Sequence, residues 1–388
     1  MGTGRGPGPL WWIEKNRTIF GPSMRKSNSV DFWRGVALVM IFINHVPGNI
    51  LADYTMRNFA IADSADLFVF LAGWSMSYAT GGPTEPESAS RVIFRLVWRA
   101  LQLYRAQLVI TLLALAILAA AALHLQNPLF LEWNDAGLAF YDPVRGLLGL
   151  ALLTHQLGYF NILPLYIVLL IMAPALILLA RRTELGALAL SLALYTTALF
   201  TDLTLPSWPS ENQWYLNPLS WQLLLLMGFL CAERARADAS FGQLARRLVP
   251  IAAVIVGVIA YVTVNGLWPD PLQVPEPRRL FLFDKTYLSP PRIVSLLAVV
   301  VAFHRLFTVI EPLIGATGRW LCKLGRNSLP VFAVGSLLTL VGQLARFIAG
   351  GSILADLVII GLGLSLSGMT AWFVEWRSTQ QSSSRSRS

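Results

Sequence analysis

Residues 31–45, DFWRGVALVMIFINH, form an apolar run with an acid and an arginine near its start and a histidine at its end. The run predicts a helix, in which the eleven residues from Arg34 to His45 make almost three whole turns. Both side chains, and that of Asp31, then lie on one face, and about 16 Å along the axis separates Arg34 from His45. Ionisable groups inside a hydrocarbon-length segment are costly and usually serve a function. In the alternative, Arg34 only reaches the lipid headgroups and His45 only hydrogen-bonds to a neighbouring helix.

The composition around this run is that of a polytopic membrane protein. Of the 388 residues 55% are hydrophobic and only 13% are charged, with a mean hydropathy of +0.58. A soluble domain carries nearer a quarter of charged residues. The net charge of +9 could indicate nucleic-acid binding, but the distribution of Lys and Arg along the chain explains it better. The two cysteines, Cys231 and Cys322, cannot form a disulfide framework and have no metal-ligand spacing.

The hydropathy pattern predicts an all-helical bundle of about ten spans inside a domain of residues 26–376. Residues 1–25 and 377–388 are predicted to be disordered tails, because they are polar or rich in Gly and Pro. Residues 144–155 are too short for a span and predict a re-entrant or interfacial helix. The sequence contains no internal repeat, which weighs against a transporter fold built from duplicated halves. The predicted spans are residues 32–52, 64–80, 101–123, 161–180, 186–203, 218–232, 248–265, 291–309, 329–349 and 353–374.

The loop charges give the orientation of this bundle. Most of the 30 Lys and Arg residues fall in the two tails and in alternate loops. Because cytoplasmic loops carry the excess of positive charge, both termini are predicted to be cytoplasmic. Asp31 and Arg34 then lie near the cytoplasmic surface, and His45 lies in the outer half of the membrane. Such a helix suits a protein that takes something from inside and delivers it outside.

Two further clusters of charged residues belong to the same picture. Asp63 and Asp66 begin the second predicted span, level with His45, where a carboxylate beside the histidine would fix its tautomer. Alternatively they are solvated acids at a helix start. On the cytoplasmic side, the arginines of an amphipathic stretch could grip the phosphates of a nucleotide-type donor, or could only anchor the helix to anionic lipid. These arginines are Arg91, Arg95, Arg99 and Arg105.

An outer loop supplies the third cluster, and the usual catalytic motifs are absent. The loop sequence FLFDKTYLSPPR brings charged and aromatic groups together, which suits a sugar surface, although tryptophans in the outer loops are also ordinary membrane anchors. There is no GxSxG elbow, Walker loop, HExxH or CxxC motif, and no histidine spacing typical of a metal site. The residues of the third cluster are Asp284, Lys285, Tyr287 and Arg292.

The stretch DFWRGVALVMIFINH resembles the signature of membrane-bound acyltransferases of the acyltransferase 3 superfamily, a basic residue followed after ten positions by histidine. Further stretches are similar, in the same order from about residue 26 to 375, to the OpgC family, succinyltransferases of osmoregulated periplasmic glucans. The sequence departs from the family pattern in its second-span acid, Asp66 instead of Glu, and in its more widely spaced arginines. The similar stretches are residues 57–75, 161–170, 217–230, 283–292 and 325–338.

The resemblance implies an O-acyltransferase of a bacterial inner membrane that needs no permanently bound cofactor and no metal. Succinyl-CoA or another acyl-CoA would be the cytoplasmic donor, and a periplasmic glucan would be the acceptor. His45 would be the catalytic residue, assisted by Arg34, Asp31 and Asp66. The donor would meet Arg95, Arg99 and Arg105, and the acceptor would meet Asp284, Lys285, Tyr287 and Arg292. The alternatives are an O-acetyltransferase for another exported polysaccharide and a solute transporter without chemistry.

Overall fold

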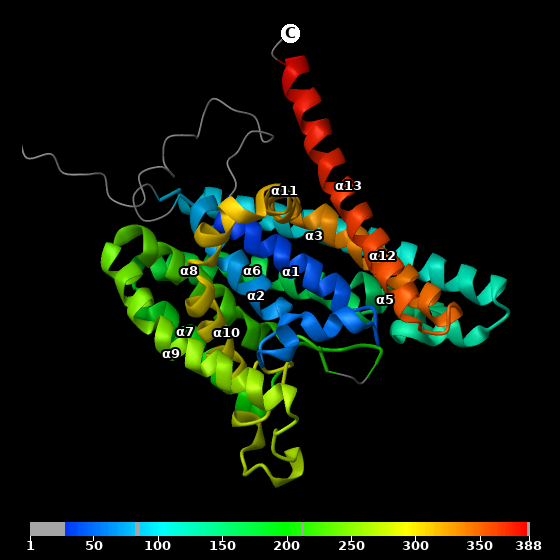
Figure 1. Cartoon of the computed structure of the whole chain (residues 1–388), viewed down its shortest axis with the longest axis horizontal. Helices are drawn as coiled ribbons and strands as arrows, with labels where there is room; N and C mark the ends of the chain where they lie inside the picture. Colours follow the sequence, from blue (N-terminus) through cyan, green and yellow to red (C-terminus); the bar gives the residue numbers. More distant parts are fainter. Residues whose placement is uncertain (1–27, 82–85, 211–212, 386–388) are drawn as a thin grey trace, which may run out of the picture.

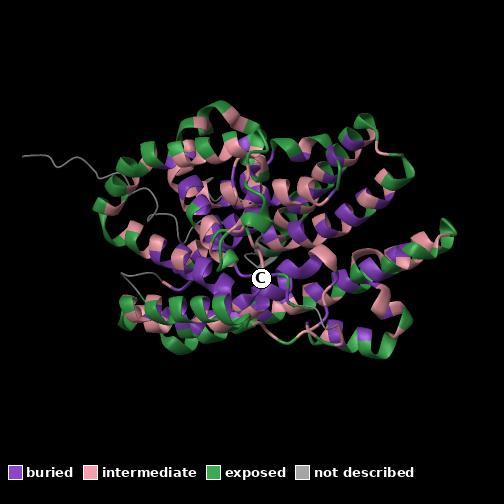
Figure 2. Ribbon diagram, turned by 90° about the horizontal axis from the view of Figure 1, so that it is seen from below, coloured by how far each residue is buried: buried purple, intermediate pink, exposed green. Residues whose placement is uncertain are grey.

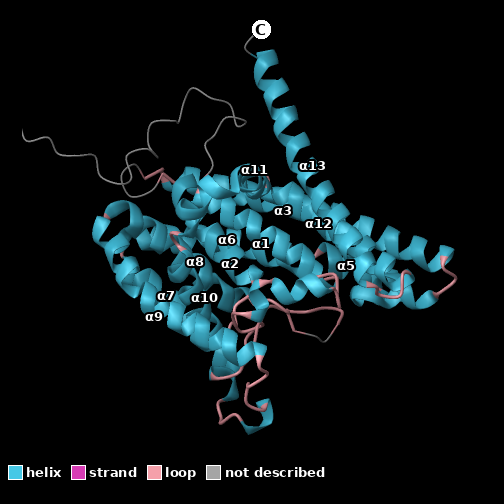
Figure 3. Ribbon diagram, viewed as in Figure 1, coloured by secondary structure: helices cyan, strands magenta, loops and turns pink. Residues whose placement is uncertain are grey.

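A computed structural model describes residues 28–81, 86–210 and 213–385, and within them every regular element is helical, as the sequence predicts (Figures 1 and 3). The predicted tail of residues 1–25 lies outside the described residues. Short 3-10 turns join several of the α-helices. The α-helices are α1 Ser29–Asn44, α2 Ser64–Ala79, α3 Ala89–His124, α4 Gly137–Tyr141, α5 Pro143–Ala151, α6 Ile162–Arg182, α7 Glu184–Thr201, α8 Pro218–Ala237, α9 Ala239–Val264, α10 Pro290–Phe303, α11 Leu306–Arg326, α12 Ser328–Ile348 and α13 Ile353–Arg385.

Six stretches of the described chain are long and apolar enough to cross a membrane, and a bent pair of helices would make a seventh. The six belong to α3, α6, α7, α9, α12 and α13, and the pair is α10 and α11, bent by 67°. The ten predicted spans all coincide largely with helices, but α1 and α2 have only 16 residues each, about 24 Å, less than the bilayer core of about 30 Å. The count of ten and the cytoplasmic location of both ends therefore stay predictions.

The outer surface of several long helices of the bundle is apolar. Large apolar side chains are exposed on three of the long helices, for example Leu112 on α3, Val254 on α9 and Met369 on α13. The buried residues concentrate toward the middle of the molecule, and the peripheral helices are largely exposed (Figure 2). A surface of exposed leucine, valine and methionine is unfavourable in water, so it is expected to face lipid.

The two short central helices are fixed by glycines that allow close backbone contact. A side chain at Gly35 of α1 would collide with the Leu321 backbone of α11, and one at Gly325 of α11 would collide with the Asp31 backbone. The same holds for α2 and α8, where Gly73 packs on the backbone of Leu225. Small residues at helix contacts are the usual means of tight packing in membranes. These contacts fix the helices that carry Arg34, His45 and Asp66.

Three helices differ from the sequence-based expectation in extent. The predicted amphipathic stretch and the third span are one continuous helix, α3, of 36 residues. The predicted span 291–309 ends earlier, because α10 stops at Phe303 and the chain turns at His304 and Arg305 into α11. Finally, α13 continues as a helix to Arg385, so the structure describes helix where a tail is predicted from residue 377.

Loops from distant parts of the chain gather on one side of the bundle, away from the C-terminal end of α13 (Figure 3). We call this side the loop-rich end, and it comprises residues 45–63, 202–210, 213–217 and 265–289. The C-terminus of α1 and the N-termini of α2, α8 and α10 meet these loops. The helix ends supply unsatisfied backbone groups and capping side chains, so polar chemistry concentrates here.

Candidate active site

A cavity of about 750 Å³ lies inside the bundle at the loop-rich end. His45 at the end of α1 and Asp63 before α2 line it, together with Lys285 from the loop before α10. The loop between α5 and α6 contributes His155 and Tyr159. Residues that are more than 200 positions apart in the sequence thus face one space.

His45 is held in one defined orientation. It is the C-terminal cap of α1, and its Nδ1 lies 2.7 Å from the Ile41 carbonyl oxygen. Because a carbonyl oxygen can only accept, Nδ1 carries the hydrogen and Nε2 keeps its lone pair. The ring packs on Tyr159 with centroids 5.1 Å apart, and the His45 carbonyl accepts a hydrogen bond of 2.7 Å from Gln343 of α12. The histidine is therefore a preorganised base or nucleophile at a cavity wall.

Asp63 and Asp66 form a capping box at the start of α2. The Asp63 carboxylate accepts from the Ala65 backbone at 2.8 Å, and the Asp66 carboxylate accepts from the Asp63 backbone at 2.7 Å. This reciprocal arrangement satisfies the free N–H groups of the helix start. It turns Asp66 back onto its own helix, where the side chain is 0% exposed, and leaves Asp63 facing the cavity.

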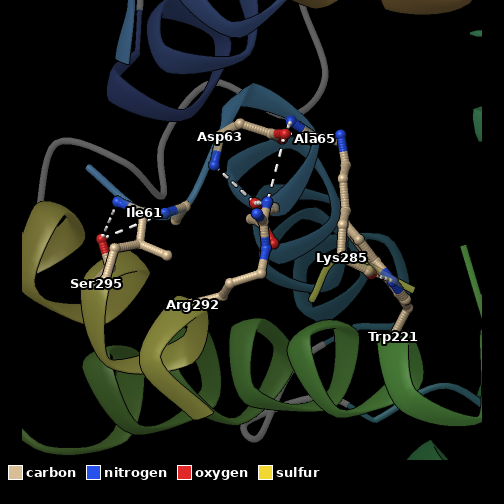
Figure 4. Close-up of polar contacts among 9 residues, drawn as sticks. Ile61, Asp63, Ala65, Trp221, Lys285, Arg292 and Ser295 are labelled. Atoms are coloured by element: carbon tan, nitrogen blue, oxygen red, sulfur yellow. Dashed lines mark hydrogen bonds and ion pairs between the residues drawn. The ribbon is translucent and has the colours of Figure 1, made fainter. Parts of the chain in front are cut away.

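Two cations from a distant part of the sequence pair with these carboxylates. Lys285 donates to Asp63 at 2.6 Å, and Arg292 of α10 lies 2.5 Å from Asp66 and 3.3 Å from Asp63 (Figure 4). Burial raises the pKa of Asp63, but Lys285 and Arg292 outweigh it and hold that pKa below its usual range. Burial likewise lowers the pKa of Lys285, but Asp63 outweighs it and the net direction is upward. The cavity wall is therefore ionised but nearly neutral in sum.

The expected pairing of Asp66 with His45 is not found in the described structure. Asp66 bonds to Arg292 and to the Asp63 backbone, and the Ile41 carbonyl holds the His45 ring in place of a carboxylate. The pattern of two acids three residues apart at a helix start is itself a capping signal, and it could have predicted this outcome. Asp63, which the sequence analysis did not include among the residues that assist His45, is the one that lines the cavity.

The predicted acceptor residues also divide into one cavity residue and three supporting residues. Lys285 lines the cavity, with its Nζ 5.7 Å from the centroid of the Tyr215 ring. Asp284 accepts from the Tyr287 backbone at 3.0 Å and so shapes the loop. Tyr287 is 2% exposed and donates to the Asp202 carbonyl, and Arg292 is buried behind the carboxylates. The structure places these three behind the wall of the cavity, which they hold in shape.

At the opposite end of α1, Arg34 has no ion-pair partner among the described residues. Its guanidinium donates to the Ser328 hydroxyl of α12 and lies 5.9 Å from the centroid of the Phe68 ring. Asp31 is buried at 6% exposure. Asn28 caps the helix by accepting from the Asp31 backbone N–H at 2.7 Å, and Asn28 Nδ2 also donates to the Asp31 carboxylate at 2.9 Å. Asp31 thus supports the start of the helix that carries Arg34.

Two of the three predicted donor arginines lie at a surface groove between α3 and α12 of about 610 Å³. Arg99 donates to Gln102 at 3.0 Å, and Arg105 lies 5.6 Å from the centroid of the Trp98 ring. Arg99 is close enough to Arg34 for their like charges to repel. Arg95 differs, because it pairs with Glu87 at 2.7 Å and donates to the Ala79 carbonyl. Arginines without carboxylate partners are suited to bind an anion.

The sequence analysis missed several charged or titratable residues of the cavity, among them Arg57 and His155. Arg57 lines it from the loop before α2, and His155 lines it from the loop after α5. Arg57 is the first residue of one of the stretches that resemble the OpgC family, and this position could have indicated that it belongs to the site. The sequence analysis considered His155 only for metal-ligand spacing. The described residues contain no group of three or more His, Cys, Asp or Glu that could hold a metal.

Comparisons with known proteins give one clear result. A family model described as OpgC protein matches residues 25–379, which is most of the chain. No curated protein and no solved structure resembles the chain closely enough to count as a match.

Proposed function

Because the chain belongs to the OpgC family, we propose that it transfers an acyl group from a cytoplasmic acyl-CoA to hydroxyl groups of periplasmic glucans. Family membership indicates a glucan-modifying transferase, and the apolar helices indicate a membrane protein. The finer parts belong to this proposal: succinyl as the acyl group, acyl-CoA as the donor, and the bacterial inner membrane as the location.

The observation that carries the proposal is the fixed tautomer of His45 in the cavity. Its Nδ1–H is committed to the Ile41 carbonyl, so Nε2 is free to accept a proton from an acceptor hydroxyl. The hydroxyl oxygen would attack the thioester carbonyl carbon, the carbon–sulfur bond would break, and Nε2 would return the proton to the departing thiolate. In the covalent alternative, Nε2 attacks the thioester carbonyl carbon first, and the carbon–sulfur bond breaks and releases the thiolate. The hydroxyl oxygen then attacks the acyl-histidine, the carbon–nitrogen bond breaks, and the hydroxyl proton passes to the thiolate.

Arg34 at the far end of α1 and Arg99 of α3 support the donor part. Arg34 and His45 are about 16 Å apart along α1, and Arg99 lies near Arg34 without a carboxylate partner among the described residues. Phosphate groups held by guanidinium groups at that end would leave a thioester on a flexible arm to reach toward Nε2. The polar wall of Asp63 and Lys285 supports the acceptor part, since both can hydrogen-bond to sugar hydroxyl groups.

The test replaces His45 by asparagine and by alanine. Asparagine carries an amide near the position of Nδ1, so it can keep the bond to the Ile41 carbonyl while it lacks Nε2 entirely. Both variants are expected to lose transfer by about two orders of magnitude or more, the scale of lost acid–base catalysis. The measurement is transfer of labelled succinyl from succinyl-CoA to unmodified periplasmic glucan by purified protein in detergent.

The control is His124→Asn, because His124 is exposed at the end of α3 and does not line the cavity. A His45→Asn variant with the wild-type rate would overturn the proposed role. The same assay with acetyl-CoA tests the acetyltransferase alternative. Detergent micelles carry no gradient, so turnover of acyl-CoA there would count against a transporter without chemistry.

A further inference from the structure

A second histidine, His155, occupies the cavity of His45 and has no part in the proposed chemistry so far. It lies in the loop between α5 and α6, is 7% exposed, and lines the cavity together with His45. A buried titratable side chain normally has its polar atoms satisfied, so each ring nitrogen of His155 needs a partner.

The backbone around His155 is fixed by its neighbours. The His155 N–H donates to the Gly149 carbonyl at 3.1 Å. The preceding residue, Thr154, donates from its hydroxyl to the Trp208 carbonyl at 2.7 Å, and the Trp208 N–H donates back to the Thr154 carbonyl at 3.2 Å. Gly149 must lack a side chain, because a Cβ there would lie 2.7 Å from the Trp208 carbonyl oxygen and 2.9 Å from the His155 Cβ. The ring is thus presented from a tightly packed support.

The single hydrogen bond of the His155 ring fixes its tautomer. Nε2 lies 3.1 Å from the Asp135 carbonyl oxygen, which can only accept, so Nε2 carries the hydrogen. Nδ1 is left with a lone pair, and no described residue donates to it. His45 and His155 both line the cavity, and each ring keeps one lone pair that no described residue fills, on Nε2 of His45 and on Nδ1 of His155.

We infer that His155 is an acceptor-binding residue, whose Nδ1 takes a hydrogen bond from a second hydroxyl of the sugar whose first hydroxyl reacts at His45. The inference rests on the proposed function and adds a recognition contact to it. A polyhydroxylated ring offers several O–H donors on one rigid frame, which is the partner that two separated lone pairs require. The neighbouring wall suits a sugar as well, with Ser207, Ser210 and the half-exposed ring of Tyr215 lining the same space.

A matched pair of substitutions separates binding from support of the loop. Glutamine places its amide near the position of Nε2, so His155→Gln can still donate to the Asp135 carbonyl but offers no acceptor at Nδ1. Asparagine places its amide near Nδ1, so His155→Asn keeps an acceptor there and loses the Asp135 bond. His124→Gln, at an exposed histidine outside the cavity, is the control.

The expected result is a split between binding and turnover. His155→Gln should raise KM for unmodified periplasmic glucan about two- to ten-fold, the value of one neutral hydrogen bond, while kcat at saturating glucan changes much less. His155→Asn should raise that KM less than His155→Gln does. An equal rise in both variants would mean that His155 only supports its loop, and an unchanged KM in His155→Gln would remove it from the site; either result overturns the inference.

Glucosides that each lack one hydroxyl group give a second measurement. In the wild-type protein, removal of one non-reacting hydroxyl should lower kcat/KM about two- to ten-fold, and His155→Gln should abolish that discrimination. If the variant still discriminates between the complete and the deoxy glucosides as the wild type does, the inference is overturned. Acyl transfer to the glucosides in that experiment would still uphold the proposed function. A wild-type protein that transfers to no glucan would overturn the proposed function, and this inference with it.

Discussion

Replacement of Arg292 by methionine should destabilise the protein far more than its position in a predicted sugar-binding loop would suggest. Arg292 is 6% exposed and pairs with Asp66, which is 0% exposed, so the variant leaves a buried carboxylate with only a backbone hydrogen bond. Removal of one partner of a buried ion pair costs about 3–5 kcal/mol. Because the second carboxylate, Asp63, keeps Lys285 at 2.6 Å, we expect the low end, about 3 kcal/mol.

The double variant identifies the cause of this loss. Asp66→Asn removes the charge but keeps an oxygen that can accept from the Asp63 backbone, so it removes the group that Arg292→Met leaves unpaired. The two substitutions should therefore be non-additive, and the double variant should be more stable than the sum predicts by about 2 kcal/mol. Arg278→Met is the matched control, because Arg278 pairs with Glu276 at a site where both side chains are largely exposed. An exposed pair of this kind contributes about 0–1 kcal/mol.

The assay is denaturant-induced unfolding of the purified proteins in one detergent, with acyl transfer measured on the same samples. An Arg292→Met variant that is as stable as Arg278→Met and has a raised KM for the glucan would refute this reasoning. It would show instead that Arg292 binds the acceptor directly, which is the role that the loop sequence suggested.

Three other predictions concern the arginines of the groove, the location of the two chain ends, and the ion pair of Asp63 with Lys285. Arg99→Glu should raise KM for acyl-CoA about ten- to a hundred-fold and Arg95→Glu much less, because of these two only Arg95 has a carboxylate partner in the described part of the chain. Equal effects in saturation kinetics would count against a phosphate site at the groove. Reporter tags at the two ends of the chain should both indicate the cytoplasm, and a periplasmic signal from either would mean an odd number of spans. The ion pair of Asp63 stabilises the fold fully above the ordinary aspartate pKa, and this contribution is lost as the pH falls through the lowered pKa of folded Asp63. The ion pair of Lys285 stabilises the fold fully below the ordinary lysine pKa, and this contribution is lost as the pH rises through the raised pKa of folded Lys285. The stability difference between wild type and Lys285→Met should therefore stay constant from about pH 5 to 9, and unfolding titrations that show it falling between pH 5 and 7 would contradict the pairing.

The parts of the fold that the sequence predicts are those that depend on local pattern. The helices α6, α7 and α12 begin and end within a few residues of the predicted spans, because each is an apolar run between polar segments. The sequence analysis predicted one span across the turn at His304 and Arg305, because apolar residues continue on both sides of it; after the turn, α11 packs against α1. Gly35 and Gly325 are visible in the sequence, but their partners are not.

The same division applies to the candidate site. The positions of Arg34 and His45 at opposite ends of one helix follow from helical periodicity alone. The hydrogen-bond partner of His45 could not be predicted in this way. The His45 ring nitrogen bonds to a backbone carbonyl, and the sequence of side chains does not reveal which backbone group will be a partner. His155 was missed for a related reason: its importance comes from a shared cavity and an unfilled lone pair, and both depend on the packing of segments that are distant in the sequence.

The short length of α1 connects these observations. At 16 residues, about 24 Å, the helix cannot cross a bilayer core of about 30 Å unaided. Longer helices, α12 and α13, line the cavity beside α1, and the polar cap of α1 therefore opens into protein instead of lipid. His45 is then less costly than a histidine in the middle of a full span, because a helix end needs polar partners in any case. A helix that is too short to span by itself thus gives the proposed reaction a protected place between a cationic end and a hydroxyl-binding cavity.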